Sequence, residues 1–411
     1  MPDNSQRPTT VLLVAEAVTL AHFGRIVTLA KSLDPRRYRV IVACDPRYAH
    51  LDRSQAYEKV PVHSVSPAQF ARALAAGKPV YDVKTLTGYV EEDLRLLHDL
   101  APDLVVGDFR LSLAVSAPLR RVPYAAVVNA YWSPYARIRY PVPDIALTRI
   151  LGVSLAQRVF DLVRPVAFAL HAAPLNTVRR RFGLPSLGND LRRVYTWGDY
   201  TLYADLPEAV PLNGMPANHR FIGPVFWSTS HALPAWWADL PPSRPVILVT
   251  LGSSGDQSLL PDILQALASL PVTVIAATTG KNSPMNPASN VFLTDYLPMD
   301  AAVSRAQLVV CNGGSLTTYQ ALAAGVPVIG VCSNMDQLLN MAALESHGTG
   351  TAFRAARTKG SDISRAAQAL LNGQQPSEAA LHMKQTLAAF DTAERFGTFV
   401  AEVCAAKGGV P

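Results

Sequence analysis

The chain has 411 residues, of which 49% are hydrophobic and 17% are charged, and its formal net charge is +6 at pH 7. This composition excludes an intrinsically disordered protein, and no apolar run approaches the roughly 18 residues that a membrane-spanning helix needs. The length favours two domains. The polar start of the chain predicts that there is no signal peptide, and four scattered cysteines predict reduced thiols in a cytoplasmic protein.

Short apolar segments alternate with helix-like segments along the first half of the chain, which predicts a parallel sheet covered by helices. The segment Val14–Leu33 places His22 in a loop before a helix that begins near Gly24. The segment Leu104–Ala117 places Asp108 at the end of a strand and ahead of another helix. The strands expected in this half are Val11–Ala15, Tyr38–Ala43, Leu104–Gly107 and Ala125–Val128.

A basic region follows these strands. Residues 110–193 contain 13 Arg, no Lys and 3 acidic residues, and the aromatic side chains Tyr131 and Trp132 lie within it. The region is either a solvated basic surface or a contact surface for an anionic membrane or an anionic acceptor. Nucleic acid is not expected as a partner, because no known nucleic-acid-binding module accompanies the charge.

A segment rich in proline and tryptophan, 226–242, is expected to link a first domain, 1–225, to a second domain, 243–390. The second domain has the same alternation of strand and helix signals as the first. The strands expected in it are Val246–Thr250, Val272–Ala276, Val291–Leu293, Leu308–Cys311 and Val328–Val331.

The turn after Leu308–Cys311 contains Gly313 and Gly314 and is followed by a helix-period run that stops at Gly325. Backbone N–H groups and the positive end of a helix dipole meet at such a turn, which favours binding of a phosphate. A second turn of this kind follows Val246–Thr250 and contains Gly252, Ser253 and Ser254. Asp336 and Gln337 follow the next strand and are expected at the same sheet edge.

The stretch Val309–Asn340 resembles the donor-binding motif of family 1 glycosyltransferases. Two positions depart from the family pattern, because Asn312 stands for its His and Gln320 for its Glu. The resemblance implies the GT-B fold: two facing Rossmann-like, doubly wound parallel-sheet domains with a cleft between them, and a last helix, about 391–411, that crosses back to the first domain. The residues that fit the pattern are Gly313, Gly314, Thr317, Ala321, Leu322, Gly325, Val326, Pro327, Asp336 and Gln337.

The same resemblance implies roles for individual residues. His22 is expected to be the general base and Asp108 to hold its ring, with transfer that inverts the anomeric carbon. Tyr131 and Trp132, in the half that binds the acceptor in the family, are expected at the acceptor. Gln320 is expected at the ribose, where it either weakens nucleotide binding or suits a deoxyribose as in dTDP. The donor is expected to contact Gly252, Ser253, Ser254, Tyr296, Leu297, Asn312, Gly313, Gly314, Ser315, Thr317, Gln320, Asp336 and Gln337.

The function that follows is transfer of a hexose from a UDP- or dTDP-linked sugar to a hydroxyl of an apolar small-molecule or lipid acceptor. No cofactor is expected besides the donor, and metal-independent transfer is expected because the chain contains no Asp-x-Asp motif. Two alternatives remain open, a nucleotide-sugar epimerase of the same fold and a nucleotide-sugar-binding protein without turnover. A location peripheral to the inner face of the membrane is a further expectation, from the arginine-rich region.

Overall fold

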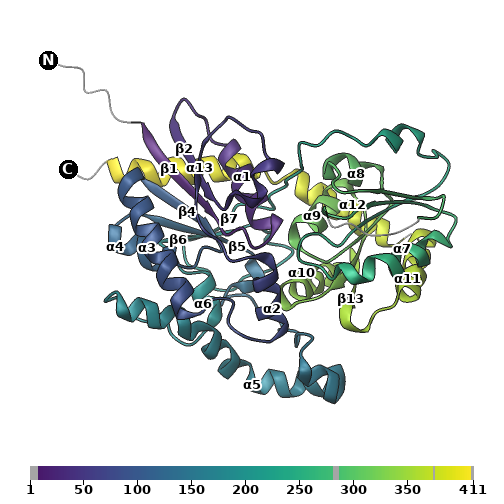
Figure 1. The fold of residues 1–411 in the computed structure, drawn as a ribbon, viewed down its shortest axis with the longest axis horizontal. Coiled ribbons are helices and arrows are strands. Elements are labelled where there is room, and N and C mark those ends of the chain that lie inside the picture. The colour runs from purple at the N-terminus through teal and green to yellow at the C-terminus, as the bar shows by residue number, and fades with distance from the viewer. Residues whose placement is uncertain (1–7, 281–286, 374, 409–411) are drawn as a thin grey trace.

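The computed structural model describes residues 8–280, 287–373 and 375–408. Two twisted sheets lie side by side, each flanked by helices (Figure 1). The first sheet has the strand order β3-β2-β1-β4-β5-β6-β7 and the second the order β10-β9-β8-β11-β12-β13. All neighbouring strands in both sheets are parallel. The predicted pair of Rossmann-like domains is therefore confirmed.

The first sheet is built from the first half of the chain. Its strands are β1 (Thr9–Ala15), β2 (Tyr38–Cys44), β3 (Glu58–Pro61), β4 (Leu104–Asp108), β5 (Tyr124–Val128), β6 (Tyr200–Tyr203) and β7 (His219–Phe221). The helices of this half are α1 (Leu20–Lys31), α2 (Pro67–Ala75), α3 (Val83–Leu100), α4 (Leu113–Arg120), α5 (Ala146–Arg181) and α6 (Leu191–Tyr195).

The second sheet follows the linker. Its strands are β8 (Val246–Thr250), β9 (Thr273–Ala277), β10 (Val291–Thr294), β11 (Leu308–Cys311), β12 (Val328–Cys332) and β13 (Gly350–Arg354). The helices of this half are α7 (Leu260–Ala268), α8 (Met299–Arg305), α9 (Ser315–Ala324), α10 (Met335–Ser346), α11 (Gly360–Asn372), α12 (Gln375–Ala388) and α13 (Thr392–Gly408).

The central strands are buried on both faces, as strands of a helix-covered parallel sheet are. In β1, Leu13 packs with α1 and α13 on one face, while Leu12 and Val14 pack with α3 and α4 on the other. The nine predicted strands are all present, within two residues at each end. Four further strands, β3, β6, β7 and β13, were not predicted. They are short and contain both polar and apolar residues, as strands at or near sheet edges often do.

The last helix, α13, lies against the first sheet although it follows the second in the chain (Figure 1). Phe396, Phe399 and Val400 are buried there with residues of β1 and β2. Arg220 on β7 pairs with Glu402 of this helix at 2.5 Å. The two domains are thus joined by two chain segments, the linker and the connection into α13.

The linker is held firmly against α1. The indole of Trp227 is 8% exposed and packs edge-on against Phe23, with 5.8 Å between ring centroids. A Cβ atom on Gly24 would lie only 2.8 Å from this indole, so the approach requires glycine at that position. Among the described residues, no helix combines the length and the apolar character needed to cross a membrane.

Candidate active site

His22 and Asp108 meet at the carboxyl edge of the first sheet. Because β1 and β4 are neighbours and Ala15 is in register with Asp108, the first turn of α1 reaches the end of β4. The helix begins at Leu20, so His22 lies within its first turn, and the prediction of a loop around His22 with a helix that begins near Gly24 is wrong. The distance from His22 Nδ1 to Asp108 Oδ1 is 2.7 Å. The ring of Phe109 stacks on the imidazole, with centroids 5.1 Å apart and planes inclined by 7°. Since Nδ1 is engaged, Nε2 is the ring nitrogen that a substrate can meet.

Arg25 shares the carboxylate with His22. Its Nε donates to Asp108 Oδ2 at 2.7 Å, and one terminal nitrogen donates to Oδ1 at 2.9 Å. The other terminal nitrogen donates to Asn129 Oδ1 at 2.7 Å. Burial opposes ionisation of Asp108, but the charges of Arg25 and His22 outweigh it and hold the pKa of this carboxyl below its ordinary value. The dyad therefore contains a carboxylate that stays ionised.

A second buried carboxylate, Asp205, continues the polar contacts into the second domain. Asn129 Nδ2 donates to both of its oxygens at 3.2 Å, and the backbone N–H of Ala130 donates at 2.5 Å. The hydroxyl of Tyr319 on α9 donates at 3.1 Å. Burial outweighs these donors and raises the pKa of Asp205 to about 6. The side chains of the two domains thus form one hydrogen-bonded chain that leads to His22.

The glycine turn after β11 leads directly into α9, which begins at Ser315, four residues before the run that the sequence predicts. Gly313 has φ +79°, and a Cβ there would lie 2.7 Å from Met341. Gly314 is the N-cap residue and supplies no capping side chain. The N–H groups of the first turn, which includes Thr317, have no partner within a helix. This end of α9 is suited to an anion.

The two glycine turns are adjacent because β8 and β11 are neighbours, with Thr250 in register with Cys311. Asn312, which stands for the family His, accepts from Gly314 N–H and donates to Ser254 Oγ, both at 3.1 Å. Gly252 has φ +58°, and Ser253 Oγ accepts from the Leu20 N–H of α1 at 3.0 Å. The second turn therefore touches the first domain two residues from His22.

Asp336 and Gln337 are both engaged by protein atoms. Trp132 donates from its indole nitrogen to Asp336 Oδ1 at 2.7 Å, across the domain boundary. Gln337 accepts from Ser333 N–H at 2.7 Å and donates to Ser254 Oγ at 3.2 Å. Tyr131 is 1% exposed. Tyr131 is thus buried, whereas Trp132 is only partly buried and has its indole N–H already engaged, so contact of Tyr131 and Trp132 with an acceptor stays a prediction.

Two of the remaining predicted donor residues, Gln320 and Tyr296, contact the linker. Gln320 Nε2 donates to the Trp227 carbonyl at 2.5 Å, while its Oε1 is buried without a hydrogen-bond partner in the described structure. The ring of Tyr296 is stacked on His231, with centroids 5.1 Å apart, so one of its faces is already covered. Leu297 is 2% exposed.

Sequence reasoning missed Arg25, Asn129, Asp205 and Phe109. Two of them carry a signal. Arg25 lies three residues after His22 and therefore on the same helix face, and Asn129 directly follows the buried strand β5. Phe109 has φ +60°, a conformation that non-glycine residues adopt rarely and that often marks functional sites.

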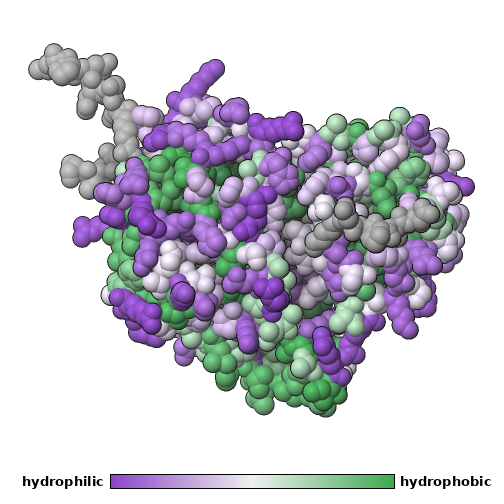
Figure 2. Space-filling view, in the orientation of Figure 1, coloured by the Kyte–Doolittle hydropathy of each residue, from purple (hydrophilic) through white to green (hydrophobic). Residues whose placement is uncertain are grey.

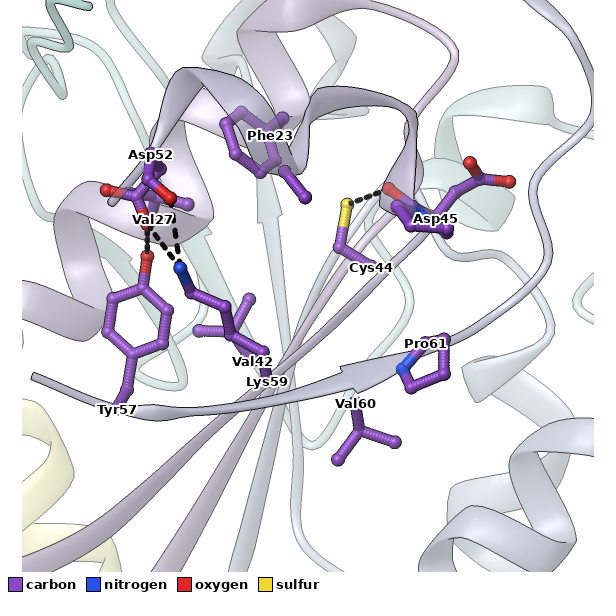
Figure 3. A pocket seen from close by; sticks show the side chains of 12 residues that line it. Phe23, Val27, Val42, Cys44, Asp45, Asp52, Tyr57, Lys59, Val60 and Pro61 are labelled. Atoms are coloured by element: carbon purple, nitrogen blue, oxygen red, sulfur yellow. Dashed lines mark hydrogen bonds and ion pairs between the residues drawn. The ribbon is translucent and has the colours of Figure 1, made fainter. Parts of the chain in front are cut away.

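A separate pocket lies on the other side of α1 (Figure 3). Its volume is about 150 Å³, and Phe23 and Val27 line it, whereas His22 does not. Three of the polar side chains that line it bind one another, since Asp52 accepts from Tyr57 and pairs with Lys59 at 3.5 Å. Within the described residues, no group of three or more His, Cys, Asp or Glu side chains is arranged to hold a metal ion.

Known proteins resemble the chain over nearly its whole length. Residues 261–400 match a protein family described as the C-terminal domain of proteins like erythromycin biosynthesis protein CIII. A PGL/p-HBAD biosynthesis glycosyltransferase of Mycobacterium tuberculosis is 50% identical over 384 residues, which cover 93% of this chain and 90% of that protein. A PGL/p-HBAD biosynthesis rhamnosyltransferase of Mycobacterium bovis is 50% identical over 382 residues, 93% of this chain and 85% of that protein. A solved spinosyn rhamnosyltransferase complexed with thymidine diphosphate has a TM-score of 0.68 at 16% identity, covering 95% of this chain and 99% of that one.

Proposed function

Because the chain belongs to the family 1 glycosyltransferases and has their GT-B fold, we propose that it transfers rhamnose from a thymidine diphosphate donor to a hydroxyl of an apolar acceptor. Sugar transfer itself is common to the relatives named above. The donor, the acceptor and the mechanism are the proposal. The observation that carries it is the His22–Asp108 pair, connected through Arg25 and Asn129 to the start of α9.

The proposed mechanism uses His22 Nε2 as general base. It takes the proton of the acceptor hydroxyl while that oxygen attacks the anomeric carbon of the donor. Asp108 accepts from Nδ1, which fixes the tautomer and stabilises the imidazolium that forms. The bond between the anomeric carbon and the diphosphate oxygen breaks on the opposite side, so the configuration inverts.

The leaving diphosphate carries the bonding electrons away and needs electrostatic stabilisation. The uncapped N-terminus of α9 and the adjacent turn around Gly252 offer N–H groups and a helix dipole at this place. Ser315 on α9 lies next to Asn129, at 3.5 Å between the two side-chain oxygens. This contact supports the view that the diphosphate and the base face one another. We expect no requirement for a divalent cation.

The surroundings of Gln320 support thymidine over uridine. Its NH₂ group is used by the Trp227 carbonyl, so Oε1, which is buried here, is the acceptor atom that remains for a ribose hydroxyl once the donor uncovers it. One acceptor suits the single free hydroxyl of a 2′-deoxyribose better than the diol of a ribose. The names of the similar proteins, a rhamnosyltransferase and a structure with thymidine diphosphate, agree with this choice.

Aromatic side chains near His22 support an apolar acceptor. Phe109 lies 5.3 Å from Tyr195 and Trp132 lies 5.0 Å from the same ring, measured between centroids. Rings of this kind bind apolar and aromatic molecules through large contact areas. We therefore place the acceptor beside His22 and these rings, and the compounds of PGL/p-HBAD biosynthesis named for the relatives are the first acceptors to test.

The test incubates the purified protein with dTDP-rhamnose or UDP-glucose and a panel of phenols with alkyl chains of increasing length. We expect mass spectrometry to detect a glycosylated phenol with dTDP-rhamnose as donor and none with UDP-glucose. NMR should show that the configuration of the anomeric carbon is inverted, and activity should be unchanged in excess EDTA. An epimerised donor in the absence of acceptor would instead indicate an epimerase. Tight donor binding without any turnover across the panel would indicate a binding protein. A strict need for Mg²⁺ or Mn²⁺ would contradict the metal-independent mechanism.

A further inference from the structure

One face of α5 exposes large apolar side chains to solvent. Leu155, Leu162, Val166 and Leu170 are 50%, 81%, 63% and 63% exposed. They are spaced seven, four and four residues apart, which places them in one stripe along the helix. We refer to these four residues as the α5 stripe. Figure 2 shows the corresponding hydrophobic surface at the lower edge of the molecule, over α5 in Figure 1.

The opposite side of the same helix is apolar as well. Phe160, Phe168 and Leu175 are buried in the core of the first domain. The α5 stripe is therefore not needed to hold the helix on the domain. Large exposed apolar surfaces of this kind mark interaction sites.

The start of the helix exposes a further apolar side chain. At Gly152 the backbone leaves the helical conformation, with φ 73° and ψ 166°, so the preceding turn points in its own direction. Ile150 in this turn is 80% exposed.

Positive charge accompanies the apolar side chains. Residues 137–181 contain eight Arg, no Lys and two Asp. Both Asp side chains are neutralised by arginines, Asp161 by Arg139 at 2.6 Å and Asp144 by Arg354 at 2.8 Å. Arg149 and Arg158 are exposed beside the apolar side chains, and within the described part of the chain neither has an ion-pair partner.

We propose that the α5 stripe and these arginines bind the surface of an anionic lipid bilayer. Exposed leucine and valine enter the boundary between headgroups and acyl chains, and arginine pairs with lipid phosphate, which is how interfacial amphipathic helices bind. A soluble protein partner or a second copy of this chain does not require unpaired positive charge along an apolar stripe, whereas an anionic membrane does.

The position of the stripe links the membrane to the cleft. Phe168, on the inner side of α5, packs against Tyr140 with centroids 5.3 Å apart, and Tyr140 lies 5.9 Å from Trp132. Trp132 in turn binds Asp336 of the second domain. A bound membrane would thus lie one helix away from the aromatic side of the cleft.

The experiment is co-flotation of the full chain with vesicles, in the absence of donor and acceptor. We expect binding to vesicles that contain phosphatidylglycerol, little binding to phosphatidylcholine alone, and loss of binding at high salt. Leu162→Gln combined with Val166→Gln should weaken partitioning at least about tenfold. Arg149→Gln combined with Arg158→Gln should weaken it roughly 30-fold, from about 1 kcal/mol for each arginine.

Matched controls lie on the second domain. Leu381→Gln changes a leucine that is 50% exposed on α12, and Arg365→Gln changes an exposed arginine on α11; both should bind vesicles as the unmodified chain does. Thermal unfolding shows whether each variant is folded. Absence of binding to phosphatidylglycerol vesicles, or equal binding by the α5 variants, would overturn the proposal. The proposal would also be overturned if the chain bound no vesicles but associated with itself, and if Leu162→Gln abolished that self-association. Since no sugar is transferred in this assay, its failure leaves the proposed function untouched.

Discussion

Tyr319 of the second domain donates a hydrogen bond to Asp205 of the first, at 3.1 Å between the two oxygens. Asp205 also binds Asn129, and Asn129 binds Arg25, which shares Asp108 with His22. The helix that begins at the proposed diphosphate site is therefore connected to the proposed base through side chains alone. We infer that contact between the domains and the position of His22 depend on one another.

Asp205 makes the stability of the protein depend on pH. Its pKa is raised from 3.8 to about 6 in the folded state. Folding therefore favours the protonated form, so this contribution to stability is fully present below pH 3.8 and is lost as the pH rises through about 6. We expect the free energy of unfolding to fall by roughly 2–3 kcal/mol over this interval through Asp205.

The measurement is chemical unfolding of the unmodified chain and of Asp205→Asn between pH 4 and 7. Asparagine does not titrate, so the pH dependence should be smaller in the variant by the amount that Asp205 contributes. The variant should also be less stable throughout, since its NH₂ group faces the donors Asn129 and Ala130. The same pH dependence in both proteins would show that Asp205 does not titrate in this range.

The second prediction concerns the proposed base. His22→Ala should lower kcat by about 10²–10⁴-fold and leave the Kd for the donor nearly unchanged, because the imidazole acts on the acceptor proton. Asp108→Asn should also lower kcat, since an amide can present its NH₂ group to Nδ1 and stabilise the wrong tautomer. Steady-state kinetics and calorimetry with the donor separate these effects. Unchanged kcat in His22→Ala would remove the mechanism.

Arg25 is predicted to position the dyad without touching substrate. Arg25→Met removes a positive charge that holds the pKa of the Asp108 carboxyl below its ordinary value, so the carboxylate should be lost at higher pH and the acid side of the pH–rate profile should move to higher pH. Arg25→Lys keeps the positive charge but lacks the guanidinium nitrogens that bind Asp108 and Asn129 at the same time. Its pH–rate profile should therefore lie between those of the unmodified chain and Arg25→Met. A drop in kcat with no movement of the profile in either variant would indicate a merely structural role.

Part of this site follows from the order of strands. His22 and Asp108 could be predicted because each follows a buried apolar strand, and such strands in a parallel sheet present their ends at one edge. The turns at Gly252 and Gly313 could be predicted for the same reason, since glycine and hydroxyl residues follow β8 and β11. The positions of these residues follow from local sequence, whereas the roles of His22 and Asp108 are predicted from the resemblance to the family.

The rest depends on contacts between distant segments. Asp205 follows β6, a four-residue strand whose sequence, YTLY, carries no strong apolar pattern. Its partner Tyr319 is 114 residues away, and Trp132 binds Asp336 across 204 residues. The packing of the two domains determines which polar side chains meet at such separations in sequence. The periodicity of residues within one segment does not contain that information. The stacking of His231 on Tyr296 has the same origin.

The last prediction concerns Gln320, which stands where the family pattern has Glu. Its amide donates to the Trp227 carbonyl at 2.5 Å, and the Trp227 indole packs against Gly24 near His22. Glutamate at this position would set a carboxylate against that carbonyl. We therefore expect Gln320→Glu to lower the free energy of unfolding by about 1–3 kcal/mol at pH 7 and to weaken the binding of both UDP and dTDP. Tighter UDP binding by this variant would show that the amide is not needed to hold the linker.

A second nucleotide separates the role of Oε1 from that of the amide. If Oε1 accepts from the free hydroxyl of the deoxyribose, the unmodified chain should bind dTDP more tightly than 3′-deoxythymidine diphosphate, by about 1 kcal/mol. In Gln320→Met the hydrogen bond to the Trp227 carbonyl is absent whichever ligand is bound, so its loss affects both affinities equally. The hydrogen bond to the ligand hydroxyl can be lost only with dTDP, because 3′-deoxythymidine diphosphate has no such hydroxyl. Calorimetry with both ligands on both proteins should therefore show a difference in affinity that disappears in the variant. If the difference persists, another group binds the hydroxyl and the position of the ribose in the proposed donor site must be changed.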